Sequence, residues 1–144
     1  MKNRKLILTG LFTIVAASAV VLAGPASSVW DNYWRDAADL EDYGYQAMYS
    51  PSSGSLYDND STRWTAVLEA GQQYKIFGVC DGDCTDLDLE LRDQFDNLVT
   101  YDRADDDHPY VTVTPRYTQR YSVNVKMADC WSSPCAYAFG IYAR

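Results

Sequence analysis

From residue 62 onward, apolar and polar residues alternate in short runs, and none of these runs has helical spacing. The alternation is strictest where Leu87, Leu89 and Leu91 are separated by acidic residues. Because successive side chains of a β-strand point to opposite faces, this pattern predicts a strand with one buried face. Further strands are expected at 64–69, 74–79, 98–101, 110–114, 121–127 and 136–142. Short strands at intervals of about 8–12 residues, with no helix between them, predict an all-β fold, an antiparallel β-sandwich of jelly-roll-like form.

Residues 1–23 have the features of a secretory signal peptide. Basic residues precede an apolar run from Leu6 to Ala23, and Ala23 is the small residue at the expected cleavage position. The run also reaches the lower limit of about 18 residues for a membrane span. It is followed by Gly24 and Pro25 rather than by basic residues, so cleavage is expected. The chain is therefore predicted to be exported, to the periplasm or the cell exterior, with no membrane attachment after cleavage.

The charge of the mature chain excludes two classes of partner. Cleavage removes three basic residues and no acid, which changes the net charge from −8 to about −11. Such a surface repels the phosphates of nucleic acids and of anionic lipids. The 12 tyrosines and four tryptophans show that this is a folded acidic domain and not a disordered acidic tail.

Four cysteines form two close pairs, Cys80 with Cys84 and Cys130 with Cys135. Export places them where disulfides persist. A zinc site or a thioredoxin-type redox pair favours two intervening residues, and here three and four residues intervene. The intervening residues are turn formers, which bring each pair within disulfide distance. We therefore expect two local structural disulfides.

Residues 24–61 are expected to form an amphipathic helix and a linker. The helix is predicted over 28–47, with Ser28 as its cap and Gly44 near its end. The residues Trp30, Tyr33, Trp34, Ala37 and Leu40 recur at helical spacing. This aromatic stripe either packs against the main domain or docks on a partner. Residues 49–61 are rich in Ser, Pro, Gly, Asn and Asp, which is typical of a linker.

Several segments together resemble the bacterial pre-peptidase C-terminal (PPC) domain family. They are TAVLEAGQQYKI (65–76), TDLDLELRD (85–93), NLV (97–99), DD (105–106) and YSVNV (121–125). The resemblance implies a small, non-catalytic β-sandwich over 62–144, of the kind carried behind secreted enzymes. Some members of the family bind insoluble polymers, so a polymer or a protein is the expected partner.

The acidic residues around the first cysteine pair raise the question of a metal. Asp86 and Asp88 lie two apart and point to the same face of their strand. The loop containing Asp105, Asp106 and Asp107 is able to approach them, and calcium accepts oxygen ligands from adjacent loops. The alternative is that these acids bond to turn backbones or face water. No other cofactor is expected.

No catalytic constellation is apparent. His108 is the single histidine, and it lies in an acid-rich loop without a recognisable nucleophile motif. The expected function is therefore an exported binding or accessory module that uses loops at the end of the sandwich. Tyr117 and Trp131 are the candidate ligand-binding rings, unless each ring covers an end of the sandwich. The alternatives are a structural envelope protein that docks through its aromatic helix, and a small secreted hydrolase.

Overall fold

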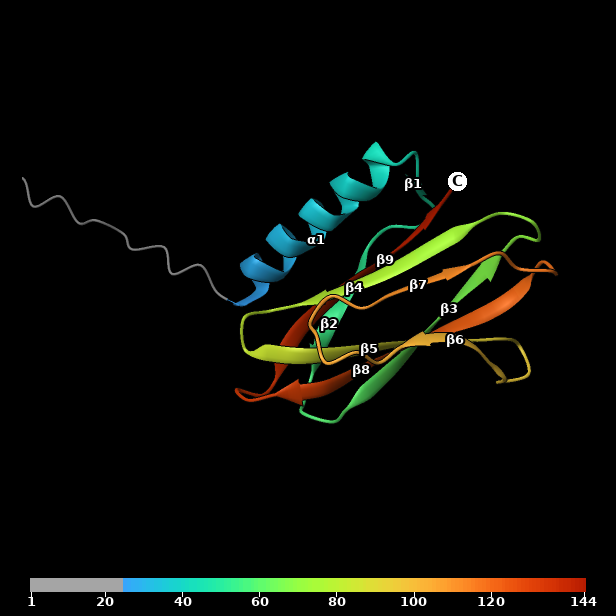
Figure 1. Cartoon of the computed structure of the whole chain (residues 1–144). Coiled ribbons are helices and arrows are strands. Elements are labelled where there is room, and N and C mark those ends of the chain that lie inside the picture. The colour runs from blue at the N-terminus through green and yellow to red at the C-terminus, as the bar shows by residue number, and fades with distance from the viewer. Residues whose placement is uncertain (1–24) are drawn as a thin grey trace, which may run out of the picture.

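Two antiparallel β-sheets pack face to face, and one helix lies across the outer face of one sheet (Figure 1). The structure, a computed structural model, describes residues 25–144; the predicted signal peptide lies outside the described residues. Within residues 25–144 the elements are α1 (Pro25–Asp42), β1 (Gln46–Ala47), β2 (Ser52–Leu56), β3 (Ser61–Leu68), β4 (Tyr74–Cys80), β5 (Cys84–Arg92), β6 (Leu98–Asp102), β7 (Tyr110–Val113), β8 (Gln119–Cys130) and β9 (Cys135–Ala143). The predicted all-β sandwich with one N-terminal helix is confirmed.

The strands are divided between two sheets in a fixed order. Sheet A has the order β1-β9-β4-β7, and β2 also pairs with β9. Sheet B has the order β3-β8-β5-β6. All pairs are antiparallel, and neighbours in a sheet are mostly not neighbours in sequence. Such crossing connections are typical of two-layered sandwiches.

The inner core lies between the two sheets. Leu87, Leu89 and Leu91 of β5 are fully buried there, as their alternation predicts. They pack with Val123 and Val125, from the adjacent strand β8. Strand β5 thus turns its leucines inward and its acids to the outer face of sheet B.

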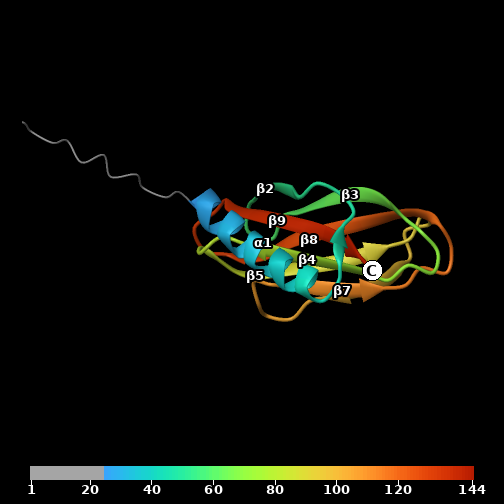
Figure 2. The same cartoon turned by 90° about the horizontal axis from the view of Figure 1, so that it is seen from above.

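Sheet A is buried on both faces. Its central strands β4 and β9 carry almost no exposed residue, which explains why their sequences are nearly continuous in apolar residues. The inner face contacts sheet B, and α1 covers the outer face over β4 and β9 (Figure 2). A second apolar cluster forms under the helix from Phe77, Val79, Ala138 and Tyr142 together with residues of α1.

Helix α1 begins at Pro25, three residues before the predicted cap, and ends at Asp42. Gly44 follows with a φ of 82°, a left-handed conformation that stops the helix. The aromatic stripe divides: Tyr33 is fully buried against sheet A, whereas the side chain of Trp34 is 57% exposed. One turn of helix separates Trp30 from Trp34, so their rings stack. Trp30 is partly buried against the apolar cluster under the helix. In the described residues, no helix has the length and apolar character needed to cross a membrane.

The segment predicted as a linker, residues 49–61, is not purely a linker. It contains β2, which pairs with β9 over five residues from Ser52 to Leu56. Its serines and glycine gave no alternating pattern because β2 is held by backbone hydrogen bonds at a sheet edge, with little side-chain burial. The sandwich therefore begins before residue 62.

Candidate functional site

Both disulfides lie at one end of the sandwich, which we call the disulfide end. Cys80–Cys84 and Cys130–Cys135 are the two local pairs that the spacing predicted, with Cα separations of 5.9 and 6.0 Å. Cys84 and Cys130 are opposite each other in the register of β5 and β8. The two stapled turns are therefore adjacent, and the backbone N–H of Trp131 donates to the carbonyl of Asp83.

Asp81 explains why the first stapled turn is acidic. Its side chain is buried, and its carboxylate accepts hydrogen bonds from the backbone N–H groups of Asp83 (3.3 Å) and Ala136 (2.7 Å). Its own N–H donates to the carbonyl of Ala136. Asp81 thus ties the β4–β5 turn to the start of β9, which is a structural role.

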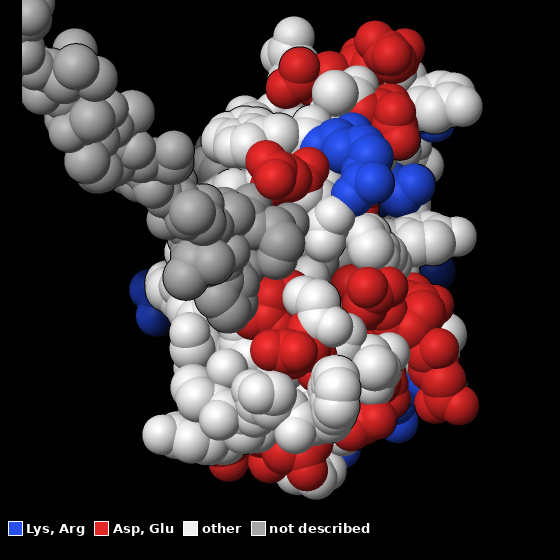
Figure 3. Space-filling view, turned by 90° about the vertical axis from the view of Figure 1, so that its left-hand side faces the viewer, with Lys and Arg blue, Asp and Glu red and all other residues white. Residues whose placement is uncertain are grey.

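The predicted calcium-binding acids do approach one another. The N–H of Leu87 donates to the carbonyl of Asp106 at 2.9 Å, which holds the acidic loop against β5. Burial raises the pKa of Asp86, and neighbouring carboxylates raise it further; these belong to Asp88, Asp105, Asp106 and Asp129. Burial also raises the pKa of Asp88, although Lys126 and Arg103 oppose the shift. Acidic side chains dominate the charged surface of the disulfide end (Figure 3).

These acids do not form a ready-made metal site. Across residues 25–144, no group of three or more His, Cys, Asp or Glu side chains is arranged to hold a metal ion. Asp107 instead contacts the ring of His108 at 2.7 Å, and the carboxylate of Asp106 accepts from the N–H of His108. Calcium binding therefore stays a prediction, and it requires these side chains to change direction.

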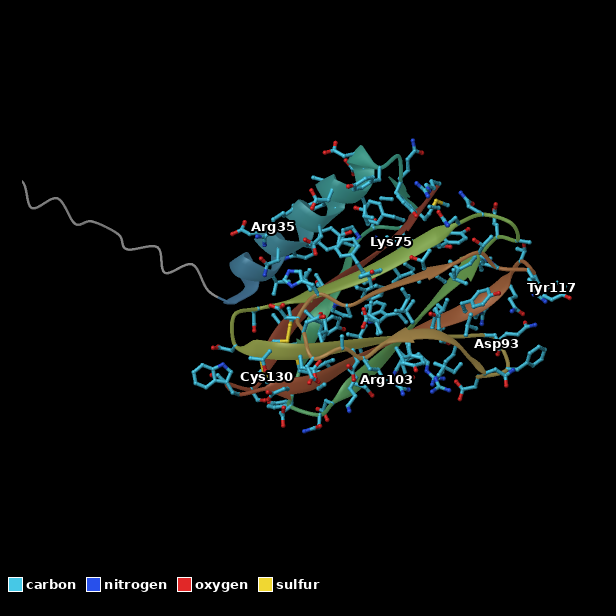
Figure 4. All side chains as sticks on the ribbon, viewed as in Figure 1. Arg35, Lys75, Asp93, Arg103, Tyr117 and Cys130 are labelled. Atoms are coloured by element: carbon cyan, nitrogen blue, oxygen red, sulfur yellow. A yellow bond between two sulfur atoms is a disulfide. The ribbon has the colours of Figure 1, made fainter. Side chains whose placement is uncertain are left out.

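The two candidate end-loop rings lie far apart. Tyr117 precedes β8 and Trp131 follows it, so the 12-residue strand separates them by about 40 Å. Figure 4 shows Tyr117 at one end of the sandwich and Cys130, next to Trp131, at the other. Both side chains are largely exposed, at 72% and 76%, so neither ring covers an end of the core. Loops at one end of the sandwich therefore include only one of these two rings, and ligand binding by either ring stays a prediction.

A hollow beside the helix is lined by several charged and aromatic side chains. We call it the helix–sheet groove, and it has a volume of about 180 Å³ between α1 and the β4–β7 side of sheet A. It is lined by Asp36, Asp39, Leu40, Tyr43, Lys75, Phe77, His108 and Tyr110. Asp36 and Asp39 are three positions apart, which places them on the same face of the helix, and Tyr43 follows directly after its end.

His108 lies between two carboxylates in this groove. Its Nδ1 is 2.7 Å from the carboxylate of Asp107, and its Nε2 is 3.9 Å from that of Asp36. Burial raises the pKa of Asp36, while His108 and Arg35 act to lower it. Two exposed rings flank the hollow: Tyr110, which has Lys75 Nζ 4.5 Å from its centroid, and Tyr43.

The His108 ring is paired with carboxylates rather than with a nucleophile. In the described part of the chain, the polar contacts of the His108 ring are carboxylates, and no hydroxyl or thiol nucleophile is hydrogen-bonded to it. Nucleophilic catalysis by a histidine needs such a partner within hydrogen-bond reach. Sequence reasoning identified His108 but missed Asp36, because their proximity depends on where α1 docks.

Comparisons with known proteins support the fold. No protein-family model matches the chain, and no curated protein matches it. The solved structure of the pre-peptidase C-terminal domain of collagenase from Bacillus anthracis is similar, with a TM-score of 0.52 and 17% identity. The match covers 64% of this chain and 87% of that domain. The chain therefore has a PPC-like fold.

A second solved structure of similar fold is PliG from Aeromonas hydrophila, a periplasmic inhibitor of g-type lysozyme. Its TM-score is 0.50 at 13% identity, and the match covers 68% of this chain and 88% of PliG. At these identities the likeness concerns the fold alone.

Proposed function

We propose that the mature chain is an exported, non-catalytic binding or accessory module, and that the helix–sheet groove is its main ligand-binding surface. The observation that carries this proposal is the convergence of Asp36, Asp39, His108 and two exposed tyrosine rings on one hollow. Export is supported by the signal-peptide pattern and by two disulfides, which persist in oxidising compartments.

The groove favours a polyhydroxylated polymer as ligand. Exposed rings such as Tyr43 and Tyr110 offer flat apolar faces on which sugar rings stack. Carboxylates accept hydrogen bonds from hydroxyl groups, and Asp36 and Asp39 provide them beside the rings. The resemblance to the PPC family agrees with this ligand class, because some members bind insoluble polymers.

Co-sedimentation with insoluble polysaccharides tests the proposal. The mature chain is incubated with cellulose, chitin and peptidoglycan, and immobilised g-type lysozyme serves as a protein alternative because PliG inhibits that enzyme. Tyr110→Ala and Asp36→Asn are expected to lower retention on one polysaccharide at least tenfold. Tyr57→Ala removes an equally exposed ring outside the groove and is expected to leave retention unchanged. Equal retention of all variants, or retention on lysozyme alone, contradicts the proposal.

A second candidate is docking of α1 on an envelope protein. It is favoured by Trp34, whose side chain is 57% exposed and whose ring stacks on that of Trp30 with centroids 6.3 Å apart. Exposed tryptophans are frequent anchors of protein interfaces. Under this candidate Trp34→Ala abolishes retention on an immobilised envelope fraction, and Tyr110→Ala does not.

A further inference from the structure

Strand β3 leaves one edge of sheet B open. In the described residues it pairs on one side only, with β8. Backbone groups of an antiparallel strand point alternately toward and away from the partner. The carbonyl of Asp60 accepts from Met127 of β8 at 2.9 Å, whereas the carbonyl of Val67 accepts from the hydroxyl of Tyr49 at 2.7 Å. The odd-numbered residues of 61–67 therefore direct their N–H and C=O groups to the open edge.

From Ser61 to Thr65 this edge lacks most of the features that usually prevent strand addition. At Val67 the Tyr49 hydroxyl already occupies the outward carbonyl, so a strand that pairs along the whole edge displaces that hydroxyl. The register of β3 with β8 runs through all eight residues without a bulge, and β3 contains no proline. Its single charged residue, Arg63, is paired with Asp96 at 3.1 Å. Edges without bulges, prolines or free charges are open to pairing with another chain.

An apolar cleft of about 350 Å³ lies just inside the same edge. Trp64 and Ala66 of β3 line one side of it, and Phe139 and Ile141 of β9 line another. The Trp64 ring meets Phe139 edge-on, with centroids 5.9 Å apart. Ser52, at the start of β2, is the lining residue from that strand and is too small to fill the space. An added strand at β3 would direct alternate side chains toward this cleft.

We propose that β3 binds an extended segment of another protein as an added strand, with one apolar side chain of that segment seated in the cleft. This recognition goes beyond the proposed function and uses a different surface from the helix–sheet groove. The backbone edge supplies affinity, and the cleft supplies preference for an apolar residue.

A second copy of this chain is a poorer occupant. Each mature copy has a net charge of about −11, so two copies repel one another.

Amide exchange measured by NMR tests this proposal on the mature chain. The probe is a synthetic ten-residue peptide of alternating threonine and valine, with one central phenylalanine and a lysine at each end. Its binding is expected to slow exchange of the Thr65 and Val67 N–H groups at least tenfold. The N–H of Thr112, on the edge strand β7, is expected to be unaffected. The same peptide N-methylated on its pairing edge is expected to give no slowing.

Two variants separate the edge from the cleft. Thr65→Pro removes an outward N–H without breaking the pairing with β8, and is expected to abolish binding. Ala66→Leu fills the cleft and is expected to weaken binding at least tenfold even if the proline variant does not fold. Val67→Thr alters only the outer face of the strand and is the matched control, with unchanged affinity.

Three results overturn the inference. The first is absence of slowed exchange at millimolar peptide, and the second is equal slowing by the N-methylated peptide. The third is a concentration-dependent dimer that disappears in Thr65→Pro, because it identifies a second copy as the occupant. Since none of these variants touches the helix–sheet groove, polysaccharide retention and peptide binding succeed or fail independently.

Discussion

At Gly140 the backbone of β9 has no side chain, and the hydroxyl of Tyr33 occupies the space. A Cβ at this position would lie 2.5 Å from that oxygen and 2.9 Å from the ring of Tyr142. Both tyrosines are fully buried, so neither ring is free to move away. Gly140→Ala is therefore expected to cost about 1–3 kcal/mol of unfolding free energy through overpacking. Urea denaturation measures it, and Gly82→Ala is the control, because a Cβ there meets nothing within 4 Å. Equal stability of the two variants would falsify the close approach of α1 to sheet A.

Contacts between single residues show which parts of the site could be predicted from the sequence and which could not. The disulfides were predictable because each pair closes a short local turn. The acidic loop was correctly expected near β5, since Leu87 N–H bonds to Asp106. The proximity of His108 to Asp36 was not predictable, because it joins residues 72 positions apart through the docking of a helix.

At the scale of elements, β5 shows how one strand places two kinds of carboxylate on its outer face. Burial raises the pKa of Asp86, with further increases from neighbouring acids. Burial also acts to raise the pKa of Glu90, but hydrogen bonds from Arg103 and Arg92 prevail and lower it below its ordinary value of 4.5. Ionised Asp86 therefore destabilises the fold, and ionised Glu90 stabilises it.

Opposite effects on stability are expected when these charges are removed. Asp86→Asn is expected to stabilise the protein at pH 7 by up to about 1 kcal/mol, and Glu90→Gln to destabilise it by a similar amount. The folded-state pKa of Asp86 is raised, so its cost is absent well below 3.8 and appears as pH rises through the shifted pKa. The contribution of Glu90 is present above 4.5 and is lost as pH falls through its lowered pKa. Urea denaturation at pH 7 and about pH 3 checks both, and effects of the same sign at pH 7 contradict this account.

Elements that bury side chains could be predicted from the sequence, whereas an element held mainly by backbone hydrogen bonds could not. Strand β5 was evident because one face is fully apolar. Strand β2 was missed because it is held by backbone hydrogen bonds at a sheet edge, and its serine-rich sequence shows no alternation of apolar and polar residues. The division of the aromatic stripe on α1 was also missed, since all its members are apolar and only packing decides which are buried.

At the scale of the whole molecule, the two-layered sandwich was predictable, and packing of the helix against it was one of the two expectations for the aromatic stripe. The alternation of apolar and polar residues in β5 and β8 implies a sheet with one solvent-exposed face. The continuous apolar runs of β4 and β9 imply a sheet covered on both sides, and the helix is the only described element outside the sheets that covers one of them. Removing α1 would thus expose Phe77 and Val79 to water, so point substitutions test its surface better than deletion does.

Calcium binding at the acidic disulfide end is a prediction that concerns the stability of the whole domain. Burial is the main cause of the raised pKa of Asp86, and repulsion from neighbouring carboxylates adds to it; a divalent cation would relieve that repulsion. If the predicted site forms from Asp86, Asp88 and residues 105–107, calcium binds the folded chain and not the unfolded one. At a hundredfold excess over Kd this stabilises the fold by roughly 2.7 kcal/mol.

For a domain near this size, such binding raises Tm on the order of 5–10 °C, which thermal unfolding followed by circular dichroism measures. Magnesium is expected to do much less, because it requires a strict octahedral shell that loosely placed loop acids do not provide. Asp88→Asn removes one expected ligand and is expected to reduce the calcium response while the apo protein stays folded. Glu69→Gln, an acid outside the cluster, is the matched control and keeps the full response. A Tm that millimolar calcium leaves unchanged within about one degree shows that the acids serve only as turn and surface groups.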